Sequence, residues 1–379
     1  MTPKERVLAT FEGELTDKVP VHHVGFSSKA AQMILGREAY VGFGIQRWRE
    51  ARALWEGEEA HRRFLERSLR DAYELAEATD QDILRLQYWR LKERPTRKVD
   101  DYTFFYGDPE GAWRLMKFHP SFELYGVVDQ HPKERTTFES IKETVFEMEE
   151  MLDEAPSTPD ISEERNLIET FGDRYAVRVH GGFLQVPLKS TWLAAVVAKP
   201  NLIARYLDVQ TELALRRIRA LADAGAKFIF GGGDMAGNDG PFYSPRAFRE
   251  LMVPRLRIIA EECHKYGMYY LFASDGNLWP IADDLFGRTG VDGYYEIDRR
   301  AGMDLAKLRR RFPELVLVGN ISSHTLSEGT REEVIRETLS CLREAKRSRG
   351  IIVGVSNCVL PSTPEENVKA MIETIRRNR

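Results

Sequence analysis

The sequence is poor in cysteine, and it has neither a block of charge of one sign nor a long apolar run. Three cysteines in 379 residues fit a reducing cytoplasm better than a disulfide framework. The 55 basic and 59 acidic residues are interleaved, so no basic face indicates nucleic acid. No apolar run approaches the roughly 20 residues that a membrane-spanning helix needs. We therefore expect a cytoplasmic protein that binds neither nucleic acid nor a membrane.

A dinucleotide-binding turn and a signal peptide are also missing. The run Gly231-Gly232-Gly233 follows a predicted strand, but its spacing differs from Gly-x-Gly-x-x-Gly. An open doubly wound sheet is therefore only the second choice for the fold. The first 15 residues are too charged for a signal peptide, and they predict a helix because Thr2 and Glu5 have the spacing of a capping box.

What the sequence does contain is an alternation of short apolar strands and amphipathic helices. Helix starts are marked by Thr330 with Glu333 and by Thr363 with Glu366, which have capping-box spacing. The predicted strands cover residues 18–25, 81–86, 175–180, 226–230, 268–273, 293–297, 315–318 and 350–355. This pattern predicts an α/β fold, a (β/α)8 TIM barrel with an N-terminal helical region, in one domain over residues 1–379.

One segment departs from this alternation. Two alternating pieces, 102–106 and 113–118, are separated by Gly-Asp-Pro-Glu-Gly and predict a β-hairpin. An acidic stretch that contains proline, 147–164, predicts a helix and a loop. We interpret residues 95–168 as an insertion that covers one end of the barrel.

Residues able to do chemistry follow several of the predicted strands. In a (β/α)8 barrel the carboxyl ends of the strands meet at one mouth, where active sites lie. Asp275 follows the strand 268–273, and its carboxylate can act as a base, a ligand or an orienting group. The alternative is a turn aspartate that bonds its own backbone before Gly276. Asp234, which follows the three glycines, has the same two interpretations.

His180 and Glu296 are the other predicted catalytic residues. A buried Glu296 would have a raised pKa and could donate a proton to a leaving oxygen, whereas at the rim it would pair with Arg299 or Arg300. His180 ends a strand, where its imidazole can serve as acid, base or ligand. A core histidine that is satisfied by backbone groups is the alternative for His180.

Aromatic and amide side chains near the strand ends predict a flat, apolar wall that suits a ring. Of His22 and His23, only one faces inward, because side chains alternate along a strand, and the sequence does not decide which. Arg85 also ends a predicted strand. The expected substrate-binding residues are His22, Phe26, Phe183, Tyr243, Phe272, Trp279, Tyr295, Asn277, Asn320 and Asn357. Cys358 is either a metal ligand, once ionised, or a small buried residue.

Several separate motifs occur here in the order found in the uroporphyrinogen decarboxylase superfamily. They are FASDGN at 272–277, AGMD at 301–304, VGNI at 318–321 and TPEEN at 363–367, and the opening 20 residues are similar as well. The chain resembles this superfamily over nearly its whole length, which implies a TIM barrel. The superfamily contains porphyrinogen decarboxylases and methyltransferases that use a corrinoid protein, with branches acting on methanol, methylamines, methylthiols and phenyl methyl ethers.

Departures from the family patterns favour the methyltransferase branches. The decarboxylases have an Arg-Gln-Ala-Gly-Arg loop after the first strand that holds the substrate carboxylates, but residues 22–29 read HHVGFSSK. The zinc-dependent methyltransferases have a His-x-Cys after the fifth strand, and 272–274 read FAS instead. Only Cys358 stands where a late zinc ligand would be. A zinc site recomposed from Asp275, Glu296, Cys358 and a histidine is the remaining alternative.

The resemblance implies a methyltransferase that moves a methyl group from a small methylated substrate to the cobalt of a corrinoid (cobalamin) protein. A methoxy-aromatic donor, and so an O-demethylation in one-carbon metabolism, is the expected substrate class, and a homodimer is left open. Asp275, Glu296 and His180 would position the substrate and protonate the departing atom. One alternative is a uroporphyrinogen-type decarboxylase, in which Asp234 or Asp275 stabilises a protonated pyrrole. Another is a non-catalytic barrel that binds a tetrapyrrole or corrinoid.

Overall fold

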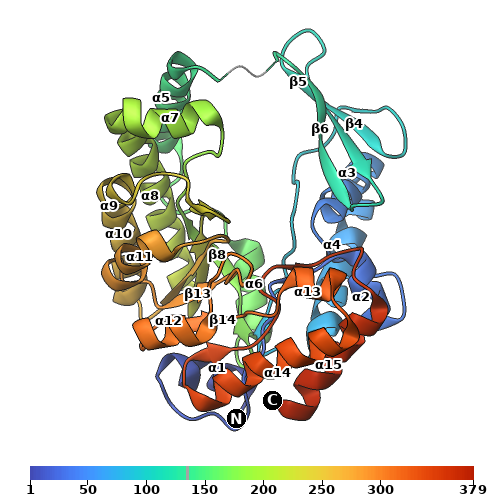
Figure 1. Ribbon diagram of the computed structural model, residues 1–379. Helices are drawn as coiled ribbons and strands as arrows, with labels where there is room; N and C mark the ends of the chain where they lie inside the picture. The colour runs from blue at the N-terminus through green and yellow to red at the C-terminus, as the bar shows by residue number, and fades with distance from the viewer. Residues whose placement is uncertain (134–135) are drawn as a thin grey trace.

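The computed structural model describes residues 1–133 and 136–379, and its core is a set of parallel strands (Figure 1). Six of them form one parallel sheet in the order β15-β14-β13-β12-β9-β8, and β2–β7 and β1–β16 form two further parallel pairs. Their bounds are β1 Gly25–Phe26, β2 Ile83–Leu84, β7 Ala176–Val177, β8 Val179–Phe183, β9 Phe228–Gly232, β12 Tyr269–Ala273, β13 Gly293–Tyr295, β14 Val316–Val318, β15 Ile351–Ile352 and β16 Cys358–Val359. The expected α/β fold with a parallel sheet is confirmed.

Single backbone contacts link the six-stranded sheet and the two strand pairs to one another. β7 and β8 are successive parts of one strand that is interrupted at Arg178. Val21 bridges to Val353, just after β15, and the amide of Asp82, just before β2, donates to the carbonyl of Val21 at 2.8 Å. All eight predicted strand regions therefore take part in the parallel pairing, but the regular ladder is interrupted on both sides of the first one.

The strand side chains alternate between two hydrophobic clusters. One cluster combines Ile83, Phe230, Leu271, Tyr295 and Val318 with residues of β7 and β15, so strands from the whole set share one interior. The intervening residues pack in a larger cluster with the helices.

Helix α1 (Pro3–Phe11) covers one end of the shared interior. It begins with the predicted capping box of Thr2 and Glu5. The ring of Phe11 lies 5.3 Å from that of Phe228 and 4.6 Å from that of Tyr269. Because these two residues open β9 and β12, α1 closes the end of the interior where the strands begin.

The remaining helices of the core surround the strands (Figure 1). They are α2 Ser28–Leu35, α6 Ser162–Phe171, α8 Pro200–Asp223, α9 Pro245–Leu251, α10 Val253–Lys265, η1 Trp279–Ile281, α11 Ala282–Arg288, α12 Leu305–Arg311, α13 Ser323–Glu328, α14 Arg331–Arg347 and α15 Glu365–Asn378. The capping box of Thr330 and Glu333 opens α14 as predicted. The one predicted at Thr363 is wrong: Pro364 is the N-cap of α15, and the Thr363 hydroxyl lies 3.2 Å from that of Ser327. In the part of the chain that is described, no helix combines the length and apolarity needed to cross a membrane.

Two arms extend beyond the ends of the strands (Figure 1). The first contains α3 (Gly44–Glu56), α4 (Glu58–Ala78) and an antiparallel sheet of β3 Arg97–Lys98, β4 Thr103–Gly107, β5 Trp113–His119 and β6 Leu124–His131. The second contains α5 (Phe138–Glu154) and α7 (Ser190–Ala198). The predicted hairpin is confirmed as β4 and β5. The proposed insertion, 95–168, includes residues 134 and 135, which lie outside the described residues, and its status as an insertion stays a prediction.

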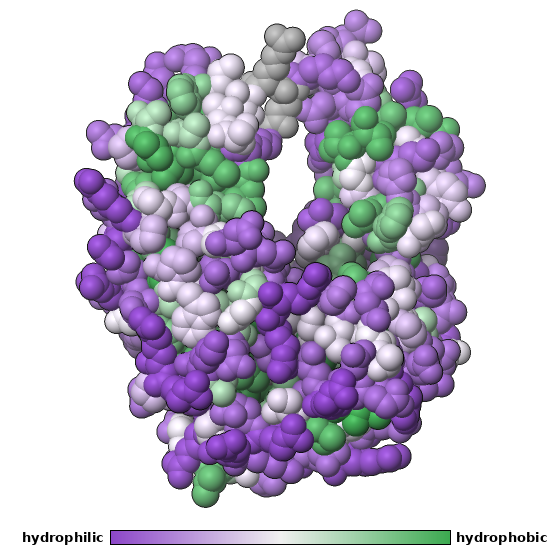
Figure 2. Space-filling view, viewed as in Figure 1, coloured by the Kyte–Doolittle hydropathy of each residue, from purple (hydrophilic) through white to green (hydrophobic). Residues whose placement is uncertain are grey.

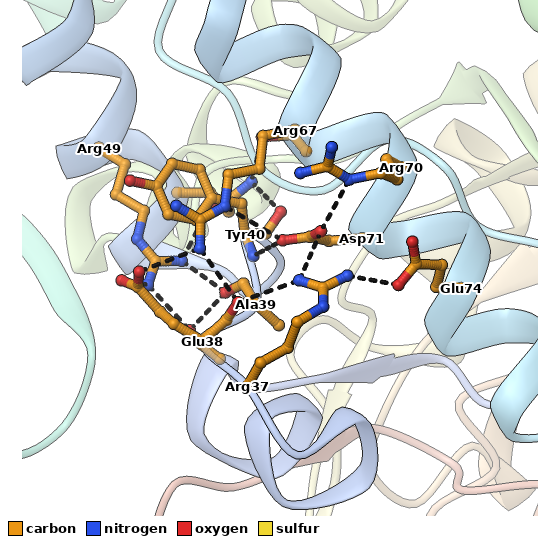
Figure 3. A network of polar contacts seen from close by, with 12 residues as sticks. Arg37, Glu38, Ala39, Tyr40, Arg49, Arg67, Arg70, Asp71 and Glu74 are labelled. Carbon is orange, nitrogen blue, oxygen red and sulfur yellow. Dashed lines mark hydrogen bonds and ion pairs between the residues drawn. The ribbon is translucent and has the colours of Figure 1, made fainter.

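A network of arginines and carboxylates fixes the base of the first arm (Figure 3). Buried Asp71 of α4 accepts the amide of Tyr40 at 2.7 Å and pairs with Arg37 at 2.9 Å. The guanidinium groups of Arg49 and Arg67 lie over the Tyr40 ring at 4.3 and 3.8 Å. This network ties the loop after α2 to both helices of the arm.

Candidate active site

A cavity of about 650 Å³ lies at the carboxyl ends of the strands. Figure 2 shows the molecule open between the two arms above this region. All four residues predicted to be catalytic line the cavity: Asp234, Asp275, Glu296 and His180. Of the expected substrate-binding residues, Phe183, Tyr295 and Asn357 line it as well.

Asp275 lies just beyond β12 and faces Asn357, which is 82 residues further along the chain. The Asn357 amide donates to its carboxylate at 2.8 Å. Burial raises the pKa of Asp275 to about 6, and the hydrogen bond from Asn357 opposes this rise only in part. Asp275 therefore titrates close to neutral pH.

Glu296 follows β13 with a backbone φ of 66°, which is uncommon for a residue other than glycine. Its carboxylate accepts no hydrogen bond from the described residues. Burial and the nearby Asp275 raise the pKa of Glu296 to about 7, although Arg178 and Arg85 act in the opposite direction. About half of the Glu296 carboxyl groups are thus protonated at pH 7. The positive φ of Glu296 is a strained backbone conformation, and such conformations cluster at functional sites.

His180 and Asp234 complete the predicted catalytic set. Burial, followed by the charge of Arg178, holds the pKa of His180 well below its usual range, so this imidazole is neutral. Its buried Nδ1 has no partner among the described residues, and its ring stacks on Phe183 with centroids 5.8 Å apart. Asp234 is exposed at the rim, and partial burial raises its pKa.

Arg178 lines the cavity and was not singled out in the sequence, although the signal for it existed. It lies two residues before His180, and side chains that far apart on a strand share a face. Arg178 is 4% exposed and Arg85, just beyond β2, is 6% exposed. Burial lowers the pKa of Arg85 to about 10, followed in effect by the charge of Arg178.

The structure also decides between the two adjacent histidines. His22 faces inward: its ring lies 5.8 Å from that of Phe230, and its Nε2 is 3.4 Å from Nη1 of Arg178. His23 faces the other side, where its Nδ1 accepts the amide of Val355 at 3.2 Å. Neither histidine lines the cavity, but His22 contacts Arg178, which does.

Six further residues expected at the site lie away from this cavity: Phe26, Tyr243, Phe272, Trp279, Asn277 and Asn320. Phe272 packs against the helices because its neighbours Leu271 and Ala273 take the inward positions. The polar ones have local partners. The Tyr243 hydroxyl donates to Sδ of Met235, Trp279 Nε1 donates to the carbonyl of Gly302, Asn277 accepts the amide of Trp279, and Asn320 donates to the carbonyl of Met303.

The predicted metal ligand, Cys358, also lies outside the lining of the cavity. Its thiol donates to the carbonyl of Val359 at 3.4 Å, and burial raises its pKa well above the usual range. Within residues 1–133 and 136–379, no three side chains of the His, Cys, Asp or Glu type are grouped to hold a metal ion. Cys358 is thus not brought together with further ligands.

One wall of the cavity comes from segments that the strand pattern did not reveal. It is made by Phe43, by the stretch after β2, and by the start of α6; its members are Phe43, Gln87, Tyr88, Trp89, Arg90, Lys92, Glu163 and Glu164. Tertiary packing of the first arm brings these residues to the strand ends. The lining combines charges of both signs: Arg85 and Arg178 are basic, Asp234 and Asp275 are acidic, and all four affect the pKa of Glu296.

Parts of the chain are similar in sequence to known proteins. The family model described as Uroporphyrinogen decarboxylase (URO-D) matches residues 188–378. A uroporphyrinogen decarboxylase of Anaeromyxobacter sp. (strain Fw109-5) is 33% identical over 129 residues, which cover 33% of this chain and 35% of the relative. The methylcobamide:CoM methyltransferase MtaA of Methanosarcina barkeri is 28% identical over 179 residues, 47% of this chain and 49% of the relative. The chain thus spans about half or less of the length of these relatives.

A solved methyltransferase from Methanosarcina mazei has the same overall fold. It aligns with a TM-score of 0.64 at 21% identity and covers 100% of this chain and 99% of that one. At this level of identity the likeness concerns the fold alone.

Proposed function

Because this chain belongs to the uroporphyrinogen decarboxylase family, we propose that it is a methyltransferase that uses a corrinoid protein. It would move a methyl group from a small methylated substrate, of which a methoxy-aromatic compound is our first choice, to the cobalt of that partner. The similarity to MtaA supports this branch of the family. The proposal includes a closed (β/α)8 barrel, which would gather the strand ends around one cavity.

The observation that carries the proposal is the Glu296 carboxyl, which lines the cavity and accepts no hydrogen bond from the described residues. When a methyl group leaves an oxygen, nitrogen or sulfur atom, the electrons of the broken bond stay on that atom, which then needs a proton. A pKa of about 7 makes Glu296 a donor at neutral pH. Asp275, held by Asn357, and the neutral His180 would orient the substrate beside it.

Two exposed aromatic rings at the rim of the cavity support the docking of a corrinoid. Trp89 and Phe183, from different parts of the chain, are 44% and 49% exposed there and present flat apolar surfaces to an approaching ring. The corrinoid would supply the electron pair for the new bond to the methyl carbon. The residues of this chain would bind and orient the donor, limit the access of water and deliver the proton.

Methylation of the corrinoid can be followed by its absorption spectrum. We would mix the purified protein with a reduced corrinoid and with methoxy-aromatic, methylamine and methylthiol donors in turn. We expect methyl transfer from the methoxy-aromatic donor. If no donor of any class methylates the corrinoid, the proposal is wrong.

The role of Glu296 predicts a pH dependence. The wild-type rate should hold up to a pH of about 7 and then fall as Glu296 loses its proton. Glu296→Gln should lower the rate by about 10²- to 10⁴-fold, the usual contribution of a general acid, and should remove this descending limb. Glu250→Gln is the control, because Glu250 is exposed and, among the described residues, pairs only with Arg246. A descending limb that persists in Glu296→Gln would assign the proton to another group.

A decarboxylase is the second candidate, and one observation favours it. Arg85, Arg90, Lys92 and Arg178 line the cavity, and such cations bind substrates with several carboxylates. Asp234 or Asp275 would then stabilise a protonated pyrrole. Incubation with uroporphyrinogen and chromatography of the products tests this. Tight corrinoid binding with neither activity would instead indicate the non-catalytic binding barrel.

A further inference from the structure

Two buried arginines in the cavity differ from the other buried arginines of the chain. Arg6 is 3% exposed and pairs with Asp17 at 2.7 Å, and Arg49 is 7% exposed and pairs with Glu38 at 3.1 Å. Arg85 and Arg178 are equally buried, yet neither forms an ion pair with any carboxylate of the described residues. A buried charge without a counter-ion is unfavourable, so its persistence at a cavity points to a ligand that supplies the counter-ion.

The hydrogen bonds of these two side chains leave some of their donors free. Nη1 of each guanidinium donates to the same carbonyl, that of Val24, with Arg178 at 3.4 Å. Nε of both is buried without a hydrogen-bond partner among the described residues. Two like charges therefore converge on one point and face the cavity with unused N–H groups.

Aromatic rings hold both guanidinium groups in place. Arg85 lies over the rings of Phe43 and Tyr88 at 5.2 and 4.8 Å. Arg178 lies over those of Phe230 and Tyr295 at 4.9 and 5.0 Å. Such contacts offset part of the cost of burial and fix the planes of the donors before a ligand arrives.

We propose that Arg85 and Arg178 form a carboxylate-binding subsite, so that the substrate of this protein is a methylated carboxylic acid. A planar carboxylate accepts paired N–H donors from guanidinium groups and would neutralise the two converging charges. This inference rests on the proposed methyl transfer for the nature of the reacting group, but the subsite itself does not. Because Glu296 lines the same cavity, the methylated end of the bound acid would share this cavity with the proton donor.

Matched ligands test the charge requirement without any corrinoid. Titration calorimetry at pH 8 would compare 3-methoxybenzoate and benzoate with 3-methoxybenzamide, which has the same shape and no charge. We expect the wild type to bind the carboxylates about 10- to 100-fold more tightly, as charge-assisted hydrogen bonds would give. Equal affinity for the acid and the amide, or binding of neither, would overturn the inference.

Variants then locate the subsite. Arg85→Met and Arg178→Met should each abolish the preference for the carboxylate. Arg178→Lys, which keeps the charge and loses the planar fork, should restore part of it. The control is Arg246→Met, because Arg246 is 84% exposed on α9 and remote from the cavity. A preference that survives in both methionine variants would place the anion elsewhere.

Thermal stability separates a ligand-binding role from a structural one. If Arg85 and Arg178 serve to bind a ligand, the variants Arg85→Met and Arg178→Met should retain or raise the Tm of the ligand-free protein. Each substitution removes a buried charge that has no carboxylate partner among the described residues. Arg6→Met should lower the Tm, since it removes one of the two guanidinium partners of the buried Asp82 carboxylate. A loss of Tm at Arg85 and Arg178 as large as at Arg6 would mean a structural role.

Failure of this inference differs from failure of the proposed function. Methyl transfer from neutral donors only would overturn the subsite and leave the methyltransferase. Tight binding of carboxylates without any methyl transfer would leave the subsite and overturn the methyltransferase.

Discussion

At the scale of single residues, the three carboxyl groups that line the cavity differ in their exposure and in their hydrogen bonds. Asp234 is exposed, Asp275 is held by Asn357, and Glu296 has no hydrogen-bond donor among the described residues. The sequence was enough to predict that these three residues and His180 lie around one cavity, because each follows or ends an apolar run that gives way to polar residues; their catalytic roles stay predictions. It was not enough for Arg178, which lies inside such a run, or for Phe272, whose direction depends on the register of β12.

The buried carboxyl of Glu296 should make the stability of the protein depend on pH. Its pKa rises from 4.5 to about 7 on folding, so between these values the folded state holds a proton that the unfolded state has lost, and stability falls as the pH rises. At about 1.4 kcal/mol for each pH unit, the loss is roughly 3 kcal/mol by pH 8. Glu296→Gln should therefore unfold at higher urea concentration than the wild type at pH 8, and at the same concentration at pH 4. An equal difference at both values would contradict the pKa.

At the scale of elements, the glycine run of β9 has a packing role that sequence reasoning missed. The sequence indicated only that the spacing of these glycines does not fit a dinucleotide-binding turn. In the structure they let neighbouring strands approach one another. A Cβ on Gly231 would meet the carbonyl oxygens of Gly181 and Gly182, the latter at 2.6 Å, and one on Gly232 would meet the backbone of Ala273. The bulge of β8 and the end of β12 are thereby drawn close to Asp234.

Gly231→Ala should destabilise the protein, because backbone carbonyl groups cannot move away as a flexible side chain can. We expect a loss of about 1–3 kcal/mol or more in urea unfolding, as for other overpacked positions. Gly237→Ala is the matched control, since its nearest neighbour would be the Phe242 ring at an ordinary 3.6 Å. Equal stability of the two variants would show that β8 can shift without cost.

The arginine network at the base of the first arm offers a second element-scale test (Figure 3). Asp71→Ala would leave the Tyr40 amide without its acceptor and would remove one of the two carboxylate partners of Arg37, the other being Glu74. Because the arginines around Asp71 are partly exposed, we expect a moderate loss of roughly 2–3 kcal/mol. Glu66→Ala on the same helix removes only an exposed pair with Arg62 and should leave the Tm unchanged. Phe43 directly precedes α3 of this arm and packs against the Arg85 guanidinium, so carboxylate affinity should fall in Asp71→Ala as well.

At the scale of the whole molecule, apolar runs were sufficient to locate all eight strand regions and the hairpin. They could not show how the parallel pieces are joined, because that depends on single contacts between distant residues. The bridge from Val21 to Val353 and the hydrogen bond from Asp82 to Val21 leave no pattern in the sequence. The wall of the cavity built by the first arm was unpredictable for the same reason.

Asp82 is where these distant parts meet, and its removal should loosen the whole assembly. Its buried carboxylate accepts the Val21 amide at 2.8 Å and pairs with Arg6 of α1 and, at 2.5 Å, with Arg379 at the end of the chain. Asp82→Asn would leave both guanidinium groups short of a counter-ion, and breaking buried pairs of this kind costs about 3–5 kcal/mol. We expect a lower Tm and faster hydrogen exchange in residues 20–24 and 81–86.

The matched control for this prediction is Asp80→Asn, because Asp80 pairs with Arg376 at the exposed surface and should leave the Tm unchanged. In Asp82→Asn the effect should spread to both chain ends, since α1 and Arg379 lose the same anchor. The cavity lies at the opposite end of the strands, so carboxylate binding measured well below the Tm should persist. If Asp82→Asn resembles Asp80→Asn in both Tm and exchange, the Val21–Val353 bridge alone would be holding the first strand region in place.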